Sequence, residues 1–65
     1  MDVPKGWIFE FRAGVNEYQR MQGQTLLRIK ELGIKVERGY CAYRGVKYVG
    51  TFNSLAEAVT AVEAK

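Results

Sequence analysis

Two short runs rich in aromatic and β-branched residues, joined by one glycine-centred turn, constrain the fold of this chain most strongly. The runs are Tyr40–Arg44 and Lys47–Phe52, with Gly45 between them. A connection this short joins antiparallel strands, because parallel strands need a long crossover. A third alternating run, residues 34–37, precedes them across a turn at Arg38–Gly39. These runs predict a three-stranded antiparallel meander.

A helix is expected after the meander and up to the C-terminal end. Ser54 and Glu57 have the spacing of a capping box, with Ser54 as the N-cap. An apolar stripe at helical spacing follows, formed by Leu55, Ala58, Val59 and Val62. Its alanines make the stripe shallow, so the helix is expected to pack closely on the sheet.

The first half of the chain predicts one strand and one longer helix. Residues 7–12 alternate aromatic and mixed positions, which is the period of a half-buried strand. From Val15 to Leu32 the apolar residues follow a helical period, with Gly23 inside and Gly33 as a C-terminal stop. The expected element order is β-α-β-β-β-α, and the expected class is α+β.

Length and composition indicate one small domain spanning residues 1–65. Such a domain keeps only a few kcal/mol of net stability, roughly 3–5. Cys41 is the single cysteine, which excludes an internal disulfide and favours a reducing compartment. No apolar run reaches membrane-spanning length, and the first residues lack the pattern of a signal peptide. We therefore expect a cytoplasmic protein without a membrane partner.

The residue types argue against an enzyme. The chain has no histidine, one cysteine and one aspartate, Asp2. It therefore lacks the usual general base and the ligands of a zinc site. No loop resembles a phosphate cradle, and Cys41 is expected to be a small core residue. No catalytic residue, metal or cofactor is predicted.

The meander carries a local excess of positive charge. Residues 34–53 hold four basic residues against one acidic residue, and the whole chain has a net charge of +3. Alternation predicts that one face of the strands lies against the helix, with Val36, Cys41, Tyr43, Val49 and Thr51. The opposite face would show basic side chains interleaved with tyrosines, a combination that suits phosphates and bases. The residues expected there or near the turns are Lys35, Arg38, Tyr40, Arg44, Lys47 and Tyr48.

Residues 34–65 resemble two families of DNA-binding domains. Val49-Gly50-Thr51-Phe52 and the following Ala56-Glu57-Ala58 resemble the last strand and helix of ethylene-response-factor domains. Gly39-Tyr40-Cys41-Ala42-Tyr43-Arg44 is similar to the second strand of the arm-binding domains of tyrosine integrases. Both families place the sheet face opposite the helix in the major groove. The resemblance implies DNA contacts from Tyr40, Arg44 and Tyr48, and phosphate contacts from Lys35, Arg38 and Lys47.

Three hypotheses for function follow. The first is a small DNA-binding accessory protein of phage or mobile-element type that docks its sheet on duplex DNA. The second is a phage-encoded modulator of a host protein, whose interface would include Trp7, Phe9, Phe11 and Leu27. The third is binding of RNA or a single strand. The N-terminal segment could also form a homodimer contact, and the tyrosines and cations could serve only packing and solubility.

Overall fold

The computed structural model describes residues 3–33 and 38–64, which form one antiparallel sheet and one helix. The α+β class expected from the sequence is confirmed. The strands follow one another in the order β1-β2-β3-β4-β5, so each strand pairs with its neighbour in the chain. The elements are β1 (Ile8–Arg12), β2 (Val15–Gln22), β3 (Thr25–Gly33), β4 (Arg38–Arg44), β5 (Lys47–Phe52) and α1 (Leu55–Glu63).

The predicted helix from Val15 to Leu32 is wrong. This segment forms β2 and β3, joined by a two-residue turn that places Gln22 opposite Thr25. Gly23 has a φ of 64°, a left-handed conformation that favours glycine at the first position of such a turn. The glycine that looked like a weak point of a helix is therefore the turn of a hairpin. Helix propensity in this segment yields to cross-strand pairing on both of its sides.

The predicted first strand of the meander, residues 34–37, lies outside the described residues. β3 occupies the place beside β4 that the prediction gave to that run, with Ile29 opposite Ala42. The predicted meander of three strands is thus replaced by a meander of five. The hairpin of β4 and β5 has its expected turn, since Arg44 lies opposite Lys47 across Gly45 and Val46.

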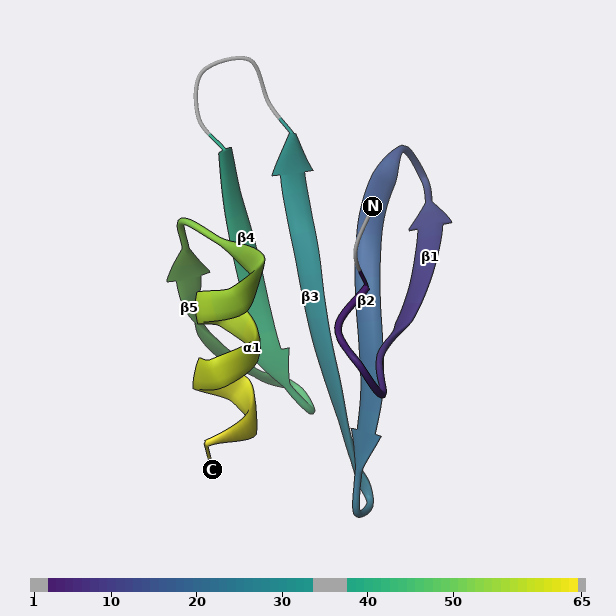
Figure 1. The fold of residues 1–65 in the computed structure, drawn as a ribbon, viewed down its shortest axis with the longest axis vertical. Coiled ribbons are helices and arrows are strands. Elements are labelled where there is room, and N and C mark those ends of the chain that lie inside the picture. Colours follow the sequence, from purple (N-terminus) through teal and green to yellow (C-terminus); the bar gives the residue numbers. More distant parts are fainter. Residues whose placement is uncertain (1–2, 34–37, 65) are drawn as a thin grey trace.

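Helix α1 covers one face of the sheet and contacts β3, β4 and β5 (Figure 1). It begins as expected, because the Ser54 side chain accepts a hydrogen bond from the Glu57 backbone amide at 3.1 Å. Between the layers lies a core of seven buried residues: Trp7, Tyr18, Leu27, Ile29, Ala42, Ala58 and Val62. Within residues 3–33 and 38–64, no helix is long and apolar enough to cross a membrane.

Small residues allow the helix to lie close to β4 and β5. Ala42 lies opposite Gly50 in the sheet, and Ala42 and Ala58 are both fully buried. A Cβ atom at Gly50 would lie 3.3 Å from the Phe52 ring, so this position leaves little room for a side chain. These three small residues therefore make room for the packing of α1 on β4 and β5.

The N-terminal segment is fastened to the far end of the helix. The indole Nε1 of Trp7 donates a hydrogen bond of 3.0 Å to the Glu63 carboxylate. Arg20 from β2 forms an ion pair with the same carboxylate. Glu63 thus links the segment before β1, the strand β2 and the last residue of α1.

Candidate nucleic-acid interface

The two faces of the sheet are the reverse of the predicted assignment. Tyr40, Ala42 and Arg44 lie on the side of the helix, not on the open side. Ala42 is fully buried, Tyr40 packs against the core, and Arg44 donates a hydrogen bond to the backbone carbonyl oxygen of Val62. The prediction placed the face with the smaller apolar residues against the helix. In the structure, Ala42 and Gly50 lie under the middle of the helix, so the larger Tyr40 and Arg44 fit beside it.

Of the predicted contact residues, Tyr48 does lie on the open side. The strand β5 has an irregularity in which Ala42 pairs with Gly50 but Tyr43 pairs with Tyr48, so Val49 is the extra residue. Such a bulge shifts the alternation of side chains by one position. Tyr48 and Thr51 consequently share a face, and their side-chain hydroxyl groups form a hydrogen bond.

Three of the six predicted contact residues lie around one hollow, and two others cannot be placed there. Arg44, Lys47 and Tyr48 line a single surface hollow, together with Thr25 and Val49. Lys35 lies outside the described residues, and so does the side chain of Arg38. The structure therefore brings together three of the six predicted residues, although Arg44 and Lys47, which lie opposite each other, approach the hollow from the helix side.

We call the sheet face away from α1 the outer face. None of the described elements packs over it, since the contacts of α1 are made on the opposite side. The pairing register places the following residues on this face: Ile8, Glu10, Arg12, Val15, Glu17, Gln19, Met21, Leu26, Arg28, Lys30, Cys41, Tyr43, Tyr48 and Thr51. The predicted positions of Cys41 and Tyr43 against the helix are therefore wrong.

On the β4 and β5 side of the outer face lies a pair of rings that we call the tyrosine platform, formed by Tyr43 and Tyr48. Their centroids are 5.6 Å apart, and the rings are tilted by 58°. Two cations from β3 lie over the Tyr43 ring: the Arg28 guanidinium at 5.6 Å and the Lys30 ammonium at 5.8 Å. Cations at these distances are attracted to the face of the ring.

The rim of the platform is polar. Thr51 accepts or donates a hydrogen bond with the Tyr48 hydroxyl, and its oxygen lies 3.4 Å from the Cys41 sulfur. The Tyr48 ring is held at its hydroxyl end, yet 54% of the residue remains exposed. A ring that is both oriented and exposed is a suitable surface for stacking.

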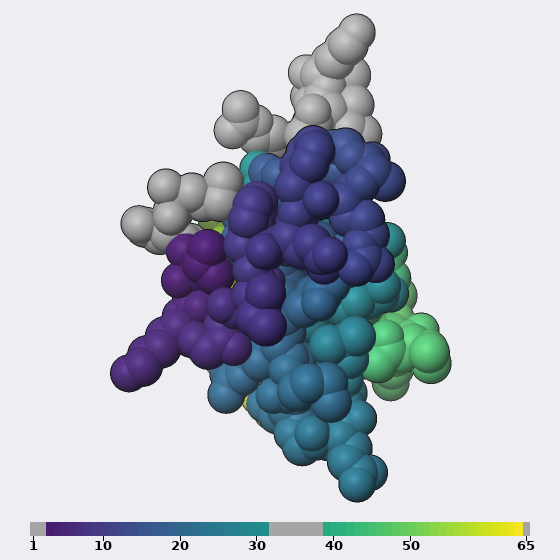
Figure 2. Space-filling model, turned by 90° about the vertical axis from the view of Figure 1, so that its right-hand side faces the viewer, coloured from purple at the N-terminus to yellow at the C-terminus, as the bar shows by residue number. Residues whose placement is uncertain are grey.

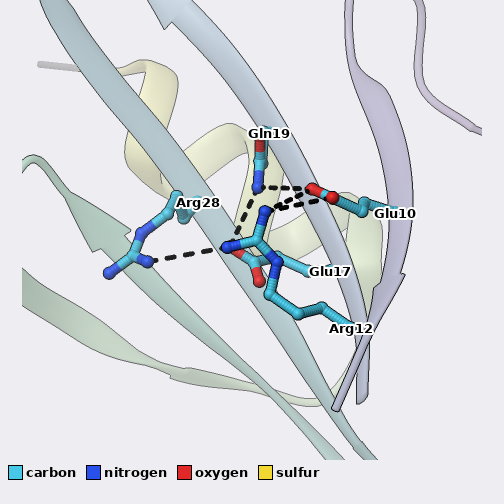
Figure 3. A network of polar contacts seen from close by, with 5 residues as sticks. All are labelled: Glu10, Arg12, Glu17, Gln19 and Arg28. Atoms are coloured by element: carbon cyan, nitrogen blue, oxygen red, sulfur yellow. Dashed lines mark hydrogen bonds and ion pairs between the residues drawn. The ribbon is translucent and has the colours of Figure 1, made fainter. Parts of the chain in front are cut away.

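Beside the platform, β1, β2 and β3 carry a network of alternating charges (Figure 3). Arg12 donates hydrogen bonds of 3.0 Å to both oxygens of Glu10. Gln19 bridges the two carboxylates, with 3.2 Å to Glu10 and 3.2 Å to Glu17. Arg28 completes the network with an ion pair of 3.7 Å to Glu17.

This network supplies the hydrogen bonds and the partner charge that the buried carboxylate of Glu17 needs. Glu17 is only 3% exposed, and a buried carboxylate needs a partner charge and hydrogen bonds. Glu10 raises the pKa of Arg12, because it accepts a hydrogen bond from the guanidinium and carries a negative charge beside it. The two acids and two arginines of the network sum to zero charge. Lys30 lies opposite Glu17 in the sheet, but among the described residues no carboxylate forms an ion pair with it.

The predicted protein interface is mostly buried. Trp7 is 6% exposed and Leu27 is fully buried in β3, so neither is a surface anchor. Phe9 is half-buried and contacts the Tyr18 ring at 5.2 Å. Leu27 lies in a strand and not in the predicted helix from Val15 to Leu32, and its neighbour in the sheet is Arg44. Phe11 alone of this group is largely exposed, at 67%.

Sequence reasoning missed three central residues of the outer face: Arg28, Lys30 and Tyr43. The two cations were assigned to the predicted helix, and Tyr43 was assigned to the covered side of the sheet. The signal was present in the two-residue spacing of Arg28 and Lys30, which places both on one face of a strand. A second signal was the recurrence of glycine at every two-residue turn, namely Gly14, Gly23 and Gly45.

Comparisons of the chain with protein-family models, with curated proteins and with solved structures found no match.

Proposed function

We propose that the chain is a non-enzymatic nucleic-acid-binding domain that receives a single strand on its outer face. The observation that carries the proposal is the tyrosine platform, in which two cations flank one ring and a second ring is exposed beside it. Phosphates need cations and bases need flat apolar surfaces. The two cations and the Tyr48 ring all lie within 5.8 Å of the centre of the Tyr43 ring.

The exposed ring of Tyr48 is the expected stacking surface for a base. Stacking of a base on an aromatic side chain contributes about 1–3 kcal/mol. Tyr43 is covered in part by Arg28 and Lys30, so its role is to hold these cations beside the stacked base. The hollow beside Tyr48, which Lys47 also lines, provides room for a neighbouring sugar or phosphate.

The width of the sheet favours a single strand over a duplex. Neighbouring strands lie about 4.8 Å apart, so five strands span about 19 Å, whereas the major groove of B-form DNA is about 12 Å wide. The duplex mode implied by the family resemblance relies on a narrower, three-stranded sheet. Duplex docking by this chain therefore stays a prediction, as does the accessory role in a phage or mobile element.

The balance of charges sets the expected strength of binding. The cations over the platform are Arg28 and Lys30, and Arg28 is shared with Glu17. Lys47 lines the hollow beside Tyr48 from the helix side of the sheet, where it lies opposite Arg44. Two or three phosphate contacts on a single strand give a slope of log K against log salt of about −1.4 to −2.1. We expect weak binding with a shallow salt dependence, in contrast to proteins that hold many phosphates.

The test is a titration of fluorescently labelled oligonucleotides followed by anisotropy. A pyrimidine single strand should bind more tightly than the duplex of the same length, with the slope given above. Tyr48→Ala and Lys30→Gln should each weaken binding several-fold. Lys5→Gln is the matched control, because it removes the same charge from an exposed residue before β1. Absence of binding, or equal losses in Lys30→Gln and Lys5→Gln, would contradict the proposal.

A further inference from the structure

The strand β1 forms one edge of the sheet and carries two exposed apolar side chains. It pairs with β2 on one side, and among the described elements no strand pairs with its other side. Ile8 and Phe11 are 68% and 67% exposed. No other described segment lies in front of this edge in the view of Figure 2. An edge of this kind is a template for another strand.

The opposite edge of the sheet is protected, whereas the β1 edge is not. β5 contains Gly50, an irregular register at Val49 and the exposed Lys47. Bulges and lysines are features that keep an edge from pairing with another chain. β1 has no proline, glycine or lysine, and its two charged residues, Glu10 and Arg12, are paired with each other. The two edges therefore differ in their capacity to pair.

The geometry of the first hairpin determines which backbone groups of β1 are free. Arg12 lies opposite Val15 across a two-residue turn, so the backbone groups of Arg12 point toward β2. Hydrogen-bonding residues alternate along an antiparallel strand. By this alternation, the amide and carbonyl groups of Phe9 and Phe11 point away from β2, toward the open edge.

These free groups are self-complementary. If β1 pairs with β1 of a second copy about a two-fold axis at Glu10, then Phe9 lies opposite Phe11 of the second copy. In this register Phe9 and Phe11 form the backbone hydrogen bonds between the two copies, and these are the residues whose amide and carbonyl groups point toward the open edge. Their rings form two cross-strand aromatic pairs, each of which stabilises a sheet by about 0.2–1 kcal/mol.

The outer side of the same register is also complementary. Ile8 lies opposite Arg12 of the second copy, so the aliphatic part of the arginine can cover the exposed isoleucine. Glu10 lies opposite Glu10 of the second copy. Arg12 of the same strand donates hydrogen bonds to each Glu10 and balances its negative charge. Both exposed apolar residues of β1 are therefore buried in one register.

We propose that two copies of the chain associate through β1, antiparallel and centred on Glu10, to form one continuous sheet. This pairing places both outer faces on the same side of the joined sheet, with a tyrosine platform on each half. The occupant of the edge is a second copy, because a two-fold contact needs a strand that complements itself. The inference does not depend on nucleic-acid binding, so either proposal can fail alone.

Sedimentation equilibrium of the full chain over a range of concentrations tests the association. The expected result is a reversible dimer of twice the 7.4 kDa chain mass. Phe11→Lys should shift the protein to monomer, because it places a charge in each aromatic pair. Val46→Lys is the matched control: Val46 is fully exposed in the turn between β4 and β5, and this variant should remain a dimer. A wild-type monomer at all concentrations, or a dimer that survives Phe11→Lys, would overturn the proposal.

A disulfide cross-link tests the register and does not require the Phe11→Lys variant to fold. In this register the Cα atoms of the two Glu10 residues lie about 4.5 Å apart, within the range of a disulfide. Glu10→Cys in a Cys41→Ser background should therefore form a covalent dimer under mild oxidation. Arg12→Cys in the same background should not, because its copies are separated by about 13 Å along the strand. Cross-linking of Arg12→Cys but not of Glu10→Cys would refute the pairing.

Discussion

Arg44 donates a hydrogen bond from its guanidinium to the backbone carbonyl oxygen of Val62, in the last turn of α1. The carbonyl groups at the C-terminal end of a helix lack partners within the helix, and a positive charge there is favourable. Arg44 thus joins β4 to the end of the helix. The role of this arginine in the structure is to hold the two layers together.

Arg44→Ala should lower the free energy of unfolding by about 1–2 kcal/mol, because it removes a charge-assisted hydrogen bond to a helix end. Arg44→Lys should recover part of the loss, since it keeps the charge. Urea denaturation followed by circular dichroism measures both changes. Unchanged stability in Arg44→Ala would show that the contact with Val62 contributes nothing in solution.

Leu27→Ala should remove most of the free energy of unfolding. Leu27 is fully buried, and such a truncation costs about 2–5 kcal/mol, against a net stability of roughly 3–5 for a domain of this size. Leu26→Ala is the matched control, because Leu26 is the preceding residue of the same strand, points to the other side and is 37% exposed. This control should lose less than about 1 kcal/mol. Equal losses at the two positions would contradict the described orientation of β3.

Leu27 also shows why half of the fold was not predictable from periodicity. In the stretch from Val15 to Leu32, Tyr18 and Ile29 face the core, but Met21 and Leu26 are exposed apolar residues on the other side. Their spacing imitates a helical stripe, and the polar residues between them are good helix formers. The C-terminal helix was predictable because a local signal, the Ser54 cap, determines where it begins.

The first hairpin contains the described non-glycine residue with a positive φ, Ala13, at 52°. With Gly14 at 79°, this turn has the left-handed conformation at both central positions that Asn-Gly sequences favour. Ala13→Asn should therefore raise the free energy of unfolding by up to about 1 kcal/mol. Val46→Asn, in the turn after Gly45, should give no comparable gain because Val46 is not left-handed. A loss of thermal stability in Ala13→Asn would argue against the described turn.

Stability should decline at high pH in part through Tyr18. Burial raises the pKa of the Tyr18 hydroxyl, and the charge of Glu31 adds to this effect. The unfolded chain loses this proton near about pH 10 and the folded chain only at higher pH. The contribution is therefore fully present below about pH 10 and is lost as pH rises through the raised pKa. Urea midpoints of Tyr18→Phe should fall less steeply above that pH than those of wild type and of Tyr48→Phe. Parallel curves for all three would contradict the expectation.

The sequence predicts which residues of β4 share a face, but it does not predict which face the helix covers. Alternation along β4 gave the correct grouping of Tyr40 with Arg44 and of Cys41 with Tyr43. Which group faces the helix could not be read locally, since it depends on the pairing of Ala42 with Gly50 and on the bulge at Val49. One such shift exchanges the two faces of a strand completely.

The most direct test of nucleic-acid binding is a nuclear magnetic resonance titration of the isotope-labelled protein with a pyrimidine single strand. The proposed function predicts that the largest shifts occur at the tyrosine platform and its two cations, Arg28 and Lys30. Signals of the helix, including Ala58 and Val62, should stay in place. Shifts that concentrate on α1, or no shifts at high oligonucleotide concentration, would contradict binding by the outer face.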